Sequence, residues 1–437
     1  MKSHATPDSP GKAPALRVYL ERLRAFSPNA RLYLVSIMIF GAAMGINQLL
    51  FNFYVLSLGF NEAVLGNLVT ARSAASLVAA LPMGYLTDRI GRKNAFIAGT
   101  AAVALSSLMM VVFPSVAVFT SMNLLLGVAQ SLSAVAMGPF LMENSGEKER
   151  TYLFSYASGL RMTATSIGEW MGGTLPAMFA SMVGVSAVSP QAYQWALGAM
   201  VLLTLLSLLP NLLMTENRQP QASRAVFAPV SYMKNNPGKL GKLIIPSLII
   251  SIGAGMIMPF MNVFFRTVHH QTDAAIGVLF AWGSLAMGIG LMIAPALAEK
   301  FGKIEIVVAT QALSIPFLAL LGFSPWFGVS LAAYYIRLTL MNMSGPVYST
   351  FVLERVDPNS RAMVASLTNM ASTFGWAFSP TISGYLQLNY GFGPAFLVTI
   401  VTYILATWMY FAWFWRKAPK PGSALAAEPE AIQTGRS

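Results

Sequence analysis

Long apolar runs, separated by short polar or charged breaks, recur along the whole chain. A helix that crosses a membrane needs about 20 mostly apolar residues, and the pattern predicts twelve such spans. We place them at 32–57, 64–86, 95–114, 117–142, 152–181, 193–213, 243–265, 274–297, 304–322, 327–352, 362–386 and 394–415. With 55% hydrophobic and 10% charged residues, the chain has too few polar groups to cover a soluble surface. The predicted fold class is an all-α polytopic membrane protein with twelve transmembrane helices.

The distribution of basic residues predicts how the chain is oriented. Threading the spans leaves only Arg266 in the short loops opposite the N-terminal tail. The short loops on the tail side contain Arg89, Arg92, Lys93, Lys148, Arg150, Lys300, Lys303, Arg355 and Arg361. By the positive-inside rule, we expect both termini in the cytoplasm, in a plasma membrane or a bacterial inner membrane. The net charge of +12 therefore needs no nucleic-acid partner.

The tails and the cysteine count add little chemistry. The N-terminus is polar and basic, so we expect no cleaved signal peptide. Residues 14–26 fit either an interfacial amphipathic helix or a solvated tail, and residues 417–437 have a disordered composition. The chain has no cysteine, which excludes disulfides and thiolate metal sites.

An internal repeat with an offset of 211 residues organises the chain. At this spacing similar residues align without gaps, as in Gly66 with Gly277, Asp88 with Glu299, Glu143 with Glu354, Arg150 with Arg361 and Gly173 with Gly384. The repeat predicts two pseudo-symmetric six-helix bundles at 32–214 and 243–416. They are joined by a cytoplasmic linker at 215–242 and flanked by tails at 1–31 and 417–437. Two such halves around a cavity are typical of transporters, although duplication of a scaffold is an alternative.

The loop between spans 2 and 3 contains a dense charged motif, Gly84-Tyr-Leu-Thr-Asp88-Arg89-Ile-Gly91-Arg92-Lys93. Gly84 permits close helix approach, Asp88 suits a helix N-terminus and Gly91 permits a tight turn. The motif resembles the loop 2–3 signature of the major facilitator superfamily. That resemblance implies two six-helix bundles, transport by alternating access, and an ion pair between Arg92 and an acid on helix 4.

The acid on helix 4 is Glu143, and a weaker copy of the motif in the second half has its own partners. Glu143 is followed seven residues later by Arg150, as in the family. The second copy contains Glu299, Lys303, Glu354 and Arg361. The resemblance implies a cytoplasmic latch that holds the outward-open state. Ordinary surface ion pairs are the alternative interpretation.

Spans 5 and 11 contain small residues at regular spacing that resemble the superfamily's antiporter motif. In span 5 they are Ala164, Gly168, Gly172 and Gly173, and Glu169 stands where the family has proline. The resemblance implies that these small residues bring span 5 against the opposite half. The same spacing is also found wherever two helices cross closely.

Four charged residues are predicted to lie within the membrane. Glu169 is the only one of the 16 carboxylates near mid-bilayer, and Arg72, Arg161 and Arg337 share the interior. Ionised side chains are costly there, so we expect Glu169 either to bind a proton or to pair with an arginine. We predict Glu169 as a proton-coupling residue and the three arginines as contacts for an anionic substrate group. Fixed ion pairs between helices are the alternative.

The family lines its cavity with helices 1, 4, 7 and 10, which implies Asn52, Asn123 and Asn262 as further substrate contacts. An apolar wall with scattered hydrogen-bonding groups suits an amphipathic organic solute. His269 and His270 fall in an outer loop, where we expect no metal site.

The predicted function is secondary transport, most simply proton-linked export of amphipathic small molecules by a monomer in a lipid bilayer. A carrier of a specific organic anion, a lipid or lysolipid translocase and a non-transporting sensor are alternatives. The sequence contains neither a Walker loop nor a nucleophile and base set, so we expect no ATPase, no enzyme and no cofactor beyond an ion gradient.

Overall fold

The computed structural model describes residues 26–215, 237–356 and 361–415, and all regular secondary structure in these ranges is helical. Among these residues, nine helical segments are long and apolar enough to cross a membrane. Two of the other expected crossings are the less apolar helices α6 (Glu147–Val183) and α14 (Phe327–Glu354), and the third is the interrupted segment formed by α15 (Arg361–Phe374) and α16 (Ser379–Tyr390). The predicted all-α fold is confirmed. The segment 14–25 and the tail 417–437 lie outside the described residues.

The first half of the chain forms six crossings, of which the last consists of two consecutive helices. They are α2 (Pro28–Ser57), α3 (Glu62–Ile90), α4 (Arg92–Val112), α5 (Val116–Glu143), α6 (Glu147–Val183), and α7 (Pro190–Leu206) with α8 (Leu208–Leu213). Polar side chains cap several of these helices: Ser27, Asn61, Ser115 and Ser189 each accept a hydrogen bond from a backbone N–H of the first turn.

The second half repeats this plan, but two of its crossings are broken. The elements are α10 (Pro237–Ile257), η1 (Met258–Phe260), α11 (Met261–Thr267), α12 (Asp273–Phe301), α13 (Lys303–Phe323), α14 (Phe327–Glu354), α15 (Arg361–Phe374), η3 (Gly375–Ala377), α16 (Ser379–Tyr390), α17 (Gly393–Tyr410) and the π-helical turn η4 (Phe411–Trp415). The span expected at 243–265 lies within the apolar segment Leu240–Thr267, but it is interrupted at the 3₁₀ turn, where Pro259 lacks a backbone N–H. A similar turn interrupts the span expected at 362–386. Helix α10 also begins at Pro237, inside the stretch expected as linker.

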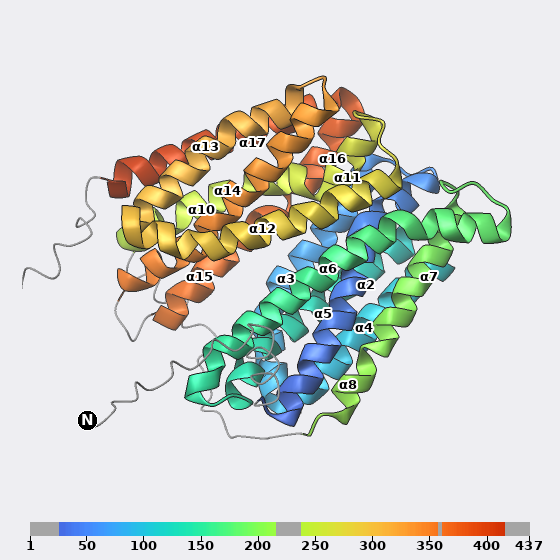
Figure 1. Cartoon of the computed structure of the whole chain (residues 1–437), viewed down its shortest axis with the longest axis horizontal. Helices are drawn as coiled ribbons and strands as arrows, with labels where there is room; N and C mark the ends of the chain where they lie inside the picture. Colours follow the sequence, from blue (N-terminus) through green and yellow to red (C-terminus); the bar gives the residue numbers. More distant parts are fainter. Residues whose placement is uncertain (1–25, 216–236, 357–360, 416–437) are drawn as a thin grey trace, which may run out of the picture.

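The helices form two bundles, α2–α8 and α10–η4, that meet at one end and diverge toward the other (Figure 1). We call the side where α2 begins the tail face, and the side where α2 ends the opposite face. Helix α3 packs against α16, and α6 packs against α12. The structure therefore has two long helix pairs that join the halves.

The hydrophobic cores show which face is open. One core, near the opposite face, contains side chains of both halves, including Phe53 and Phe264. Near the tail face the core is divided: one cluster around Phe140 belongs to the first half and another around Phe351 belongs to the second. The molecule is thus closed at the opposite face and open at the tail face.

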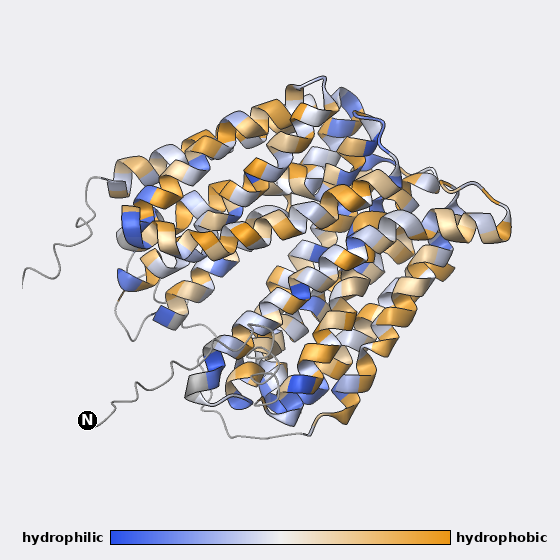
Figure 2. Ribbon diagram, in the orientation of Figure 1, coloured by the Kyte–Doolittle hydropathy of each residue, from blue (hydrophilic) through white to orange (hydrophobic). Residues whose placement is uncertain are grey.

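Hydrophobic residues predominate along the helices, and hydrophilic ones gather at helix ends (Figure 2). Large apolar side chains such as Leu202, Val401 and Trp408 are exposed on the outside of the helices. Contiguous exposed apolar surface of this kind fits a lipid environment.

Candidate functional site

Glycines bring the two halves into backbone contact near the opposite face. A Cβ added to Gly173 of α6 would lie 2.7 Å from the Asp273 carbonyl oxygen and 3.0 Å from the Gly277 Cα of α12. A Cβ on Gly66 of α3 would lie 2.2 Å from the Pro380 carbonyl oxygen of α16. Small residues permit such close crossings in membranes. Because Gly66 and Gly277 are equivalent in the repeat, the two helix pairs are related by the same pseudo-symmetry.

Two asparagines join the halves next to these crossings. Asn52 Nδ2, from α2, donates to Asn262 Oδ1 at 2.9 Å and to the Pro259 carbonyl at 2.7 Å. Asn262 Nδ2, from α11, donates to the Leu49 carbonyl at 2.8 Å. Both side chains are buried. The sequence predicted them as substrate contacts, and in this conformation they occupy each other's hydrogen-bonding groups.

A charged cluster that the sequence analysis missed lies at the same end. Arg266 Nη1 is 3.6 Å from Asp273 Oδ1, and the Arg266 guanidinium lies 4.5 Å from the centre of the Phe53 ring. Tyr193 of the first half donates to Asp273 Oδ2 at 2.5 Å. The available signal was Arg266 itself, because it is the one basic residue predicted in the opposite loops. We call Asn52, Asn262, Arg266, Asp273 and Tyr193 the outer gate.

Glu169 lies on the boundary between the halves. Its side chain is 1% exposed, and its Oε2 accepts a hydrogen bond from Ser284 Oγ of α12 at 2.8 Å. The neighbouring Ser166 donates across the same boundary to the Ala281 carbonyl at 2.9 Å. None of the ion pairs found among the described residues includes Glu169. The buried carboxyl is therefore held by a hydroxyl from the other half and not by an arginine.

Arg337 of α14 is a buried cation inside the second bundle. It is 2% exposed, its Nη2 donates to Tyr403 Oη at 3.1 Å, and its Nη1 lies 3.4 Å from Met258 Sδ. Its Nε has no hydrogen-bond partner, and no carboxylate in the part of the chain that the structure describes pairs with it.

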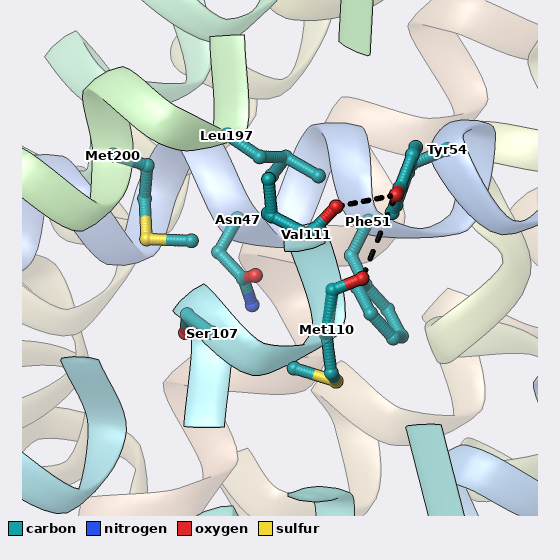
Figure 3. Close-up of a pocket in the computed structure, with 8 residues that line it drawn as sticks. All are labelled: Asn47, Phe51, Tyr54, Ser107, Met110, Val111, Leu197 and Met200. Atoms are coloured by element: carbon teal, nitrogen blue, oxygen red, sulfur yellow. Dashed lines mark hydrogen bonds between the residues drawn. The ribbon is translucent and has the colours of Figure 1, made fainter. Parts of the chain in front are cut away.

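The other predicted substrate contacts do not converge on one point. Arg72 on α3 is half-buried and Arg161 on α6 is exposed, and within the described ranges neither forms an ion pair. Asn123 is buried against its own bundle, where its Nδ2 donates to the Phe119 carbonyl at 2.8 Å. Close by, Tyr54 bonds to backbone carbonyls of α4 beside a cavity of only about 10 Å³ (Figure 3). The interior of the first bundle is tightly packed at this level.

The charged motif on the tail face forms contacts within the first half. Arg92 Nη1 is 2.8 Å from Asp88 Oδ1, and its Nε is 3.5 Å from Glu143 Oε1, the partner expected from the sequence. Gly91, at a φ of 87°, takes the left-handed turn that favours glycine. A Cβ on Gly84 would come closest to Val135, 3.7 Å away in the same half.

The second copy behaves in the same way. Lys303 pairs with Glu354 on the surface, and Arg361 Nε donates to the Leu353 carbonyl at 3.0 Å. The ion pairs that Arg92 and Lys303 form with described residues lie within their own halves. The Arg150 Nε is buried without a hydrogen-bond partner. A latch between the halves is not formed in this open tail face, and its role stays a prediction, as do the roles of Arg89 and Glu299.

Among the described residues, no group of three His, Cys, Asp or Glu side chains could hold a metal. His269 packs among the aromatic rings of Phe264, Phe265 and Phe327.

Two bundles that share one closed end, with buried polar groups on the boundary, are the architecture of a membrane transporter. The family model of the Major Facilitator Superfamily matches residues 32–380 and 243–434. The chain therefore belongs to this superfamily, as its loop motif indicated, and it is a multi-pass secondary transporter.

Relatives share low identity over most of their length. The chain is 21% identical over 346 residues to the uncharacterized MFS-type transporter YceJ of Bacillus subtilis, covering 79% of this chain and 86% of YceJ. It is 24% identical over 383 residues to the synaptic vesicular amine transporter of Mus musculus, covering 84% and 69%. It is 23% identical over 350 residues to multidrug resistance protein 2 of Bacillus subtilis, covering 78% and 84%.

Solved structures share the fold. The nucleoside transporter NupG aligns with a TM-score of 0.70 at 14% identity, covering 88% of this chain and 98% of that one. A bacterial homolog of the human lysosomal transporter Spinster, in an inward-facing and occupied conformation, aligns with a TM-score of 0.70 at 13% identity, covering 92% and 97%.

Proposed function

We propose that this chain is a proton-coupled exporter of amphipathic small organic molecules. The observation that carries the proposal is Glu169, a buried carboxyl bonded to Ser284 of the other half. Every motion that separates the halves at the opposite face must break this hydrogen bond. Glu169 is thus placed where binding of a proton and movement of the halves affect each other.

The proton cycle follows from the geometry. An ionised Glu169 accepts from the Ser284 hydroxyl while the opposite face is closed. When that face opens, the carboxyl loses this donor, and binding a proton removes the cost of an unpaired charge. The positive-inside rule places the tail face in the cytoplasm, so a proton taken up outside and released inside would accompany solute moving outward.

Two relatives support the cargo class. Their names describe a multidrug resistance protein and a transporter of amines, both of which handle organic solutes. The cavity wall expected from the sequence is apolar, with isolated amide and hydroxyl groups. Such a wall suits amphipathic solutes, which bind mainly through apolar contacts.

The test is solute-induced proton movement in proteoliposomes that contain a pH-sensitive dye. Wild type is compared with Glu169→Gln, using cationic, neutral and anionic amphiphiles. We expect Glu169→Gln to bind solute and to move no protons. The control is Glu305→Gln, a carboxyl near the tail-face end of α13, which should couple normally. Normal coupling by Glu169→Gln would exclude the proposal.

A carrier of a specific organic anion is the second candidate, and the uncompensated Arg337 favours it. A buried cation without a carboxylate partner is costly and suits an anionic group from a ligand. In the same liposomes, this candidate requires that anionic amphiphiles are transported and that cationic and neutral ones are not, without proton movement. Arg337→Gln should abolish this transport.

A further inference from the structure

The second bundle contains a cavity that the sequence analysis did not find. Its volume is about 270 Å³, near the lower end of pockets that hold small organic ligands, about 300–1,000 Å³. It lies in the half of the bundle nearer the tail face, between α10, α13, α14, α15, η3 and α17. We call it the C-terminal pocket.

The lining of the C-terminal pocket is polar but uncharged. Of the fifteen residues that line it, none is Asp, Glu, Lys, Arg or His, and most carry hydroxyl or amide groups. Trp376 and Tyr348 supply aromatic surface. Such a lining offers hydrogen bonds and ring contacts without a counter-ion, so it disfavours a charged group that would lose its hydration.

One polar atom of Gln311, at the closed end of the pocket, lacks a hydrogen-bond partner. The side chain is 5% exposed, its Nε2 donates to Ser344 Oγ at 3.3 Å, and its Oε1 is buried and unpaired. A buried carbonyl oxygen left without a donor destabilises the protein. A ligand donor in the pocket would remove that destabilisation.

The pocket is open between α14 and α15. The lining residues Gly345 and Ser349 of α14 and Asn369 and Ser372 of α15 are exposed, whereas those from α13 and α17 are buried. Helix α15 contacts α3 of the first half, so this opening lies on a side of the second bundle that neighbours the first. We expect solute that enters between the halves from the tail face to reach it.

Two residues that line the C-terminal pocket have different counterparts in the first bundle. In the repeat, Arg161 stands at the position of Ser372, and Met137 stands at the position of Tyr348. The two halves therefore present different chemistry on matching helix faces.

We propose that the C-terminal pocket is a substrate subsite for an uncharged ring with both hydrogen-bond donors and acceptors, of a size between a nucleobase and a monosaccharide. Gln311 Oε1 accepts a hydrogen bond from this ring, Asn369 binds at the mouth, and Trp376 covers one ring face. The inference rests on the proposed transport function, because it names the polar portion of the solute that the transporter would carry.

The test is equilibrium binding to the purified full-length protein by calorimetry, with uracil and D-xylose as neutral probes. Tetraphenylphosphonium, a cation without hydrogen-bonding groups, serves as competitor. We expect a neutral probe to bind, and Gln311→Met to weaken its binding about tenfold, equivalent to the loss of about 1.4 kcal/mol. The competitor should not displace the probe. Asn369→Leu, at an exposed position that does not threaten folding, should also weaken binding.

Gln387→Met is the matched control. Gln387 is also buried, its Oε1 also lacks a partner, and its Nε2 also bonds to a serine hydroxyl, but it does not line the pocket. Gln387→Met should bind the neutral probe as tightly as wild type does. The inference is overturned if neither neutral probe binds, if Gln311→Met and Asn369→Leu bind normally, if Gln387→Met weakens binding equally, or if the cation displaces the probe.

This measurement needs neither a membrane nor a proton gradient. Binding that persists in a protein that never moves protons refutes the proposed proton coupling and leaves the subsite intact. Proton-coupled transport without binding of either neutral probe refutes the proposed subsite and leaves the proposed proton coupling intact.

Discussion

Asn52 and Asn262, one from each half, are bonded to each other at 2.9 Å, and each also bonds to a backbone carbonyl of the other half. A carboxamide can donate and accept at once, so this pair closes the opposite face without any charge. Opening that face must break all three hydrogen bonds together.

Asn52→Leu should shift the transporter toward the state that is open at the opposite face. The change removes two hydrogen bonds and leaves buried groups unpaired, at a cost of about 1–3 kcal/mol. Because the chain has no cysteine, spin labels at Ser186→Cys and Asn389→Cys would report only the distance between the halves on that face. We expect a longer distance in Asn52→Leu and no change in the control Asn94→Leu, whose side chain bonds only within its own half.

Gly173→Ala should favour the same state through steric pressure. The new Cβ would lie 2.7 Å from the Asp273 carbonyl oxygen, a backbone atom that cannot rotate away. The same pair of spin labels should show a longer distance. Gly159→Ala, on the same helix with no atom within 4 Å of its Cβ, is the control. Equal distances in both variants would mean that the α6–α12 crossing does not limit closure.

Arg92→Ala should destabilise the protein far more than Lys303→Ala, although the two residues are equivalent in the repeat. Arg92 is 9% exposed and Glu143 13%, so the change leaves a half-buried carboxylate without this cation, at a cost of about 1–3 kcal/mol. Lys303 and Glu354 are 34% and 54% exposed, and such pairs contribute less than about 1 kcal/mol. Thermal unfolding followed by tryptophan fluorescence measures both, and similar shifts in Tm would contradict the prediction.

Stability should fall as the pH drops through the range in which His269 titrates. Burial, together with the adjacent His270, lowers the pKa of His269. The folded protein therefore binds fewer protons than the unfolded chain, so unfolding is favoured once the pH falls below about 6.5, the ordinary value for histidine. The loss should continue until the pH reaches the lowered pKa of the folded state.

His269→Phe should reduce this pH dependence, because it keeps the ring contacts and removes the titrating group. The measurement is the unfolding temperature at neutral and at mildly acidic pH. His270→Asn is the comparison, since asparagine tolerates the φ of 53° at that position. It removes only the smaller cause of the lowered pKa of His269, so most of the pH dependence should remain. If His269→Phe keeps the full acid sensitivity of wild type, another titratable group causes that sensitivity.

The sequence predicted the helices and the burial of Glu169, because both follow from local hydrophobicity and from the cost of charge in lipid. It did not predict that Ser284 would be the partner of Glu169, since a serine in an apolar span has no distinguishing pattern. Asn52 and Asn262 were expected to face solute, but which end of a cavity is closed depends on conformation and not on residue type. The C-terminal pocket was missed for a related reason. A single glutamine in an apolar span, such as Gln311, does not predict a cavity, and whether its carbonyl oxygen lacks a hydrogen-bond partner depends on how the helices pack.

Ser251 links the two broken crossings of the second bundle. Its hydroxyl donates to the Ala371 carbonyl at 2.9 Å and accepts from the Gly375 backbone N–H at 3.0 Å, where α15 gives way to η3. The tail-face segments α10 and α15 are thus fastened together at the level of the break. Any movement of one of these segments on the tail face must therefore carry the other with it or break both hydrogen bonds. The walls that α10 and α15 supply to the C-terminal pocket are thus expected to shift as one unit.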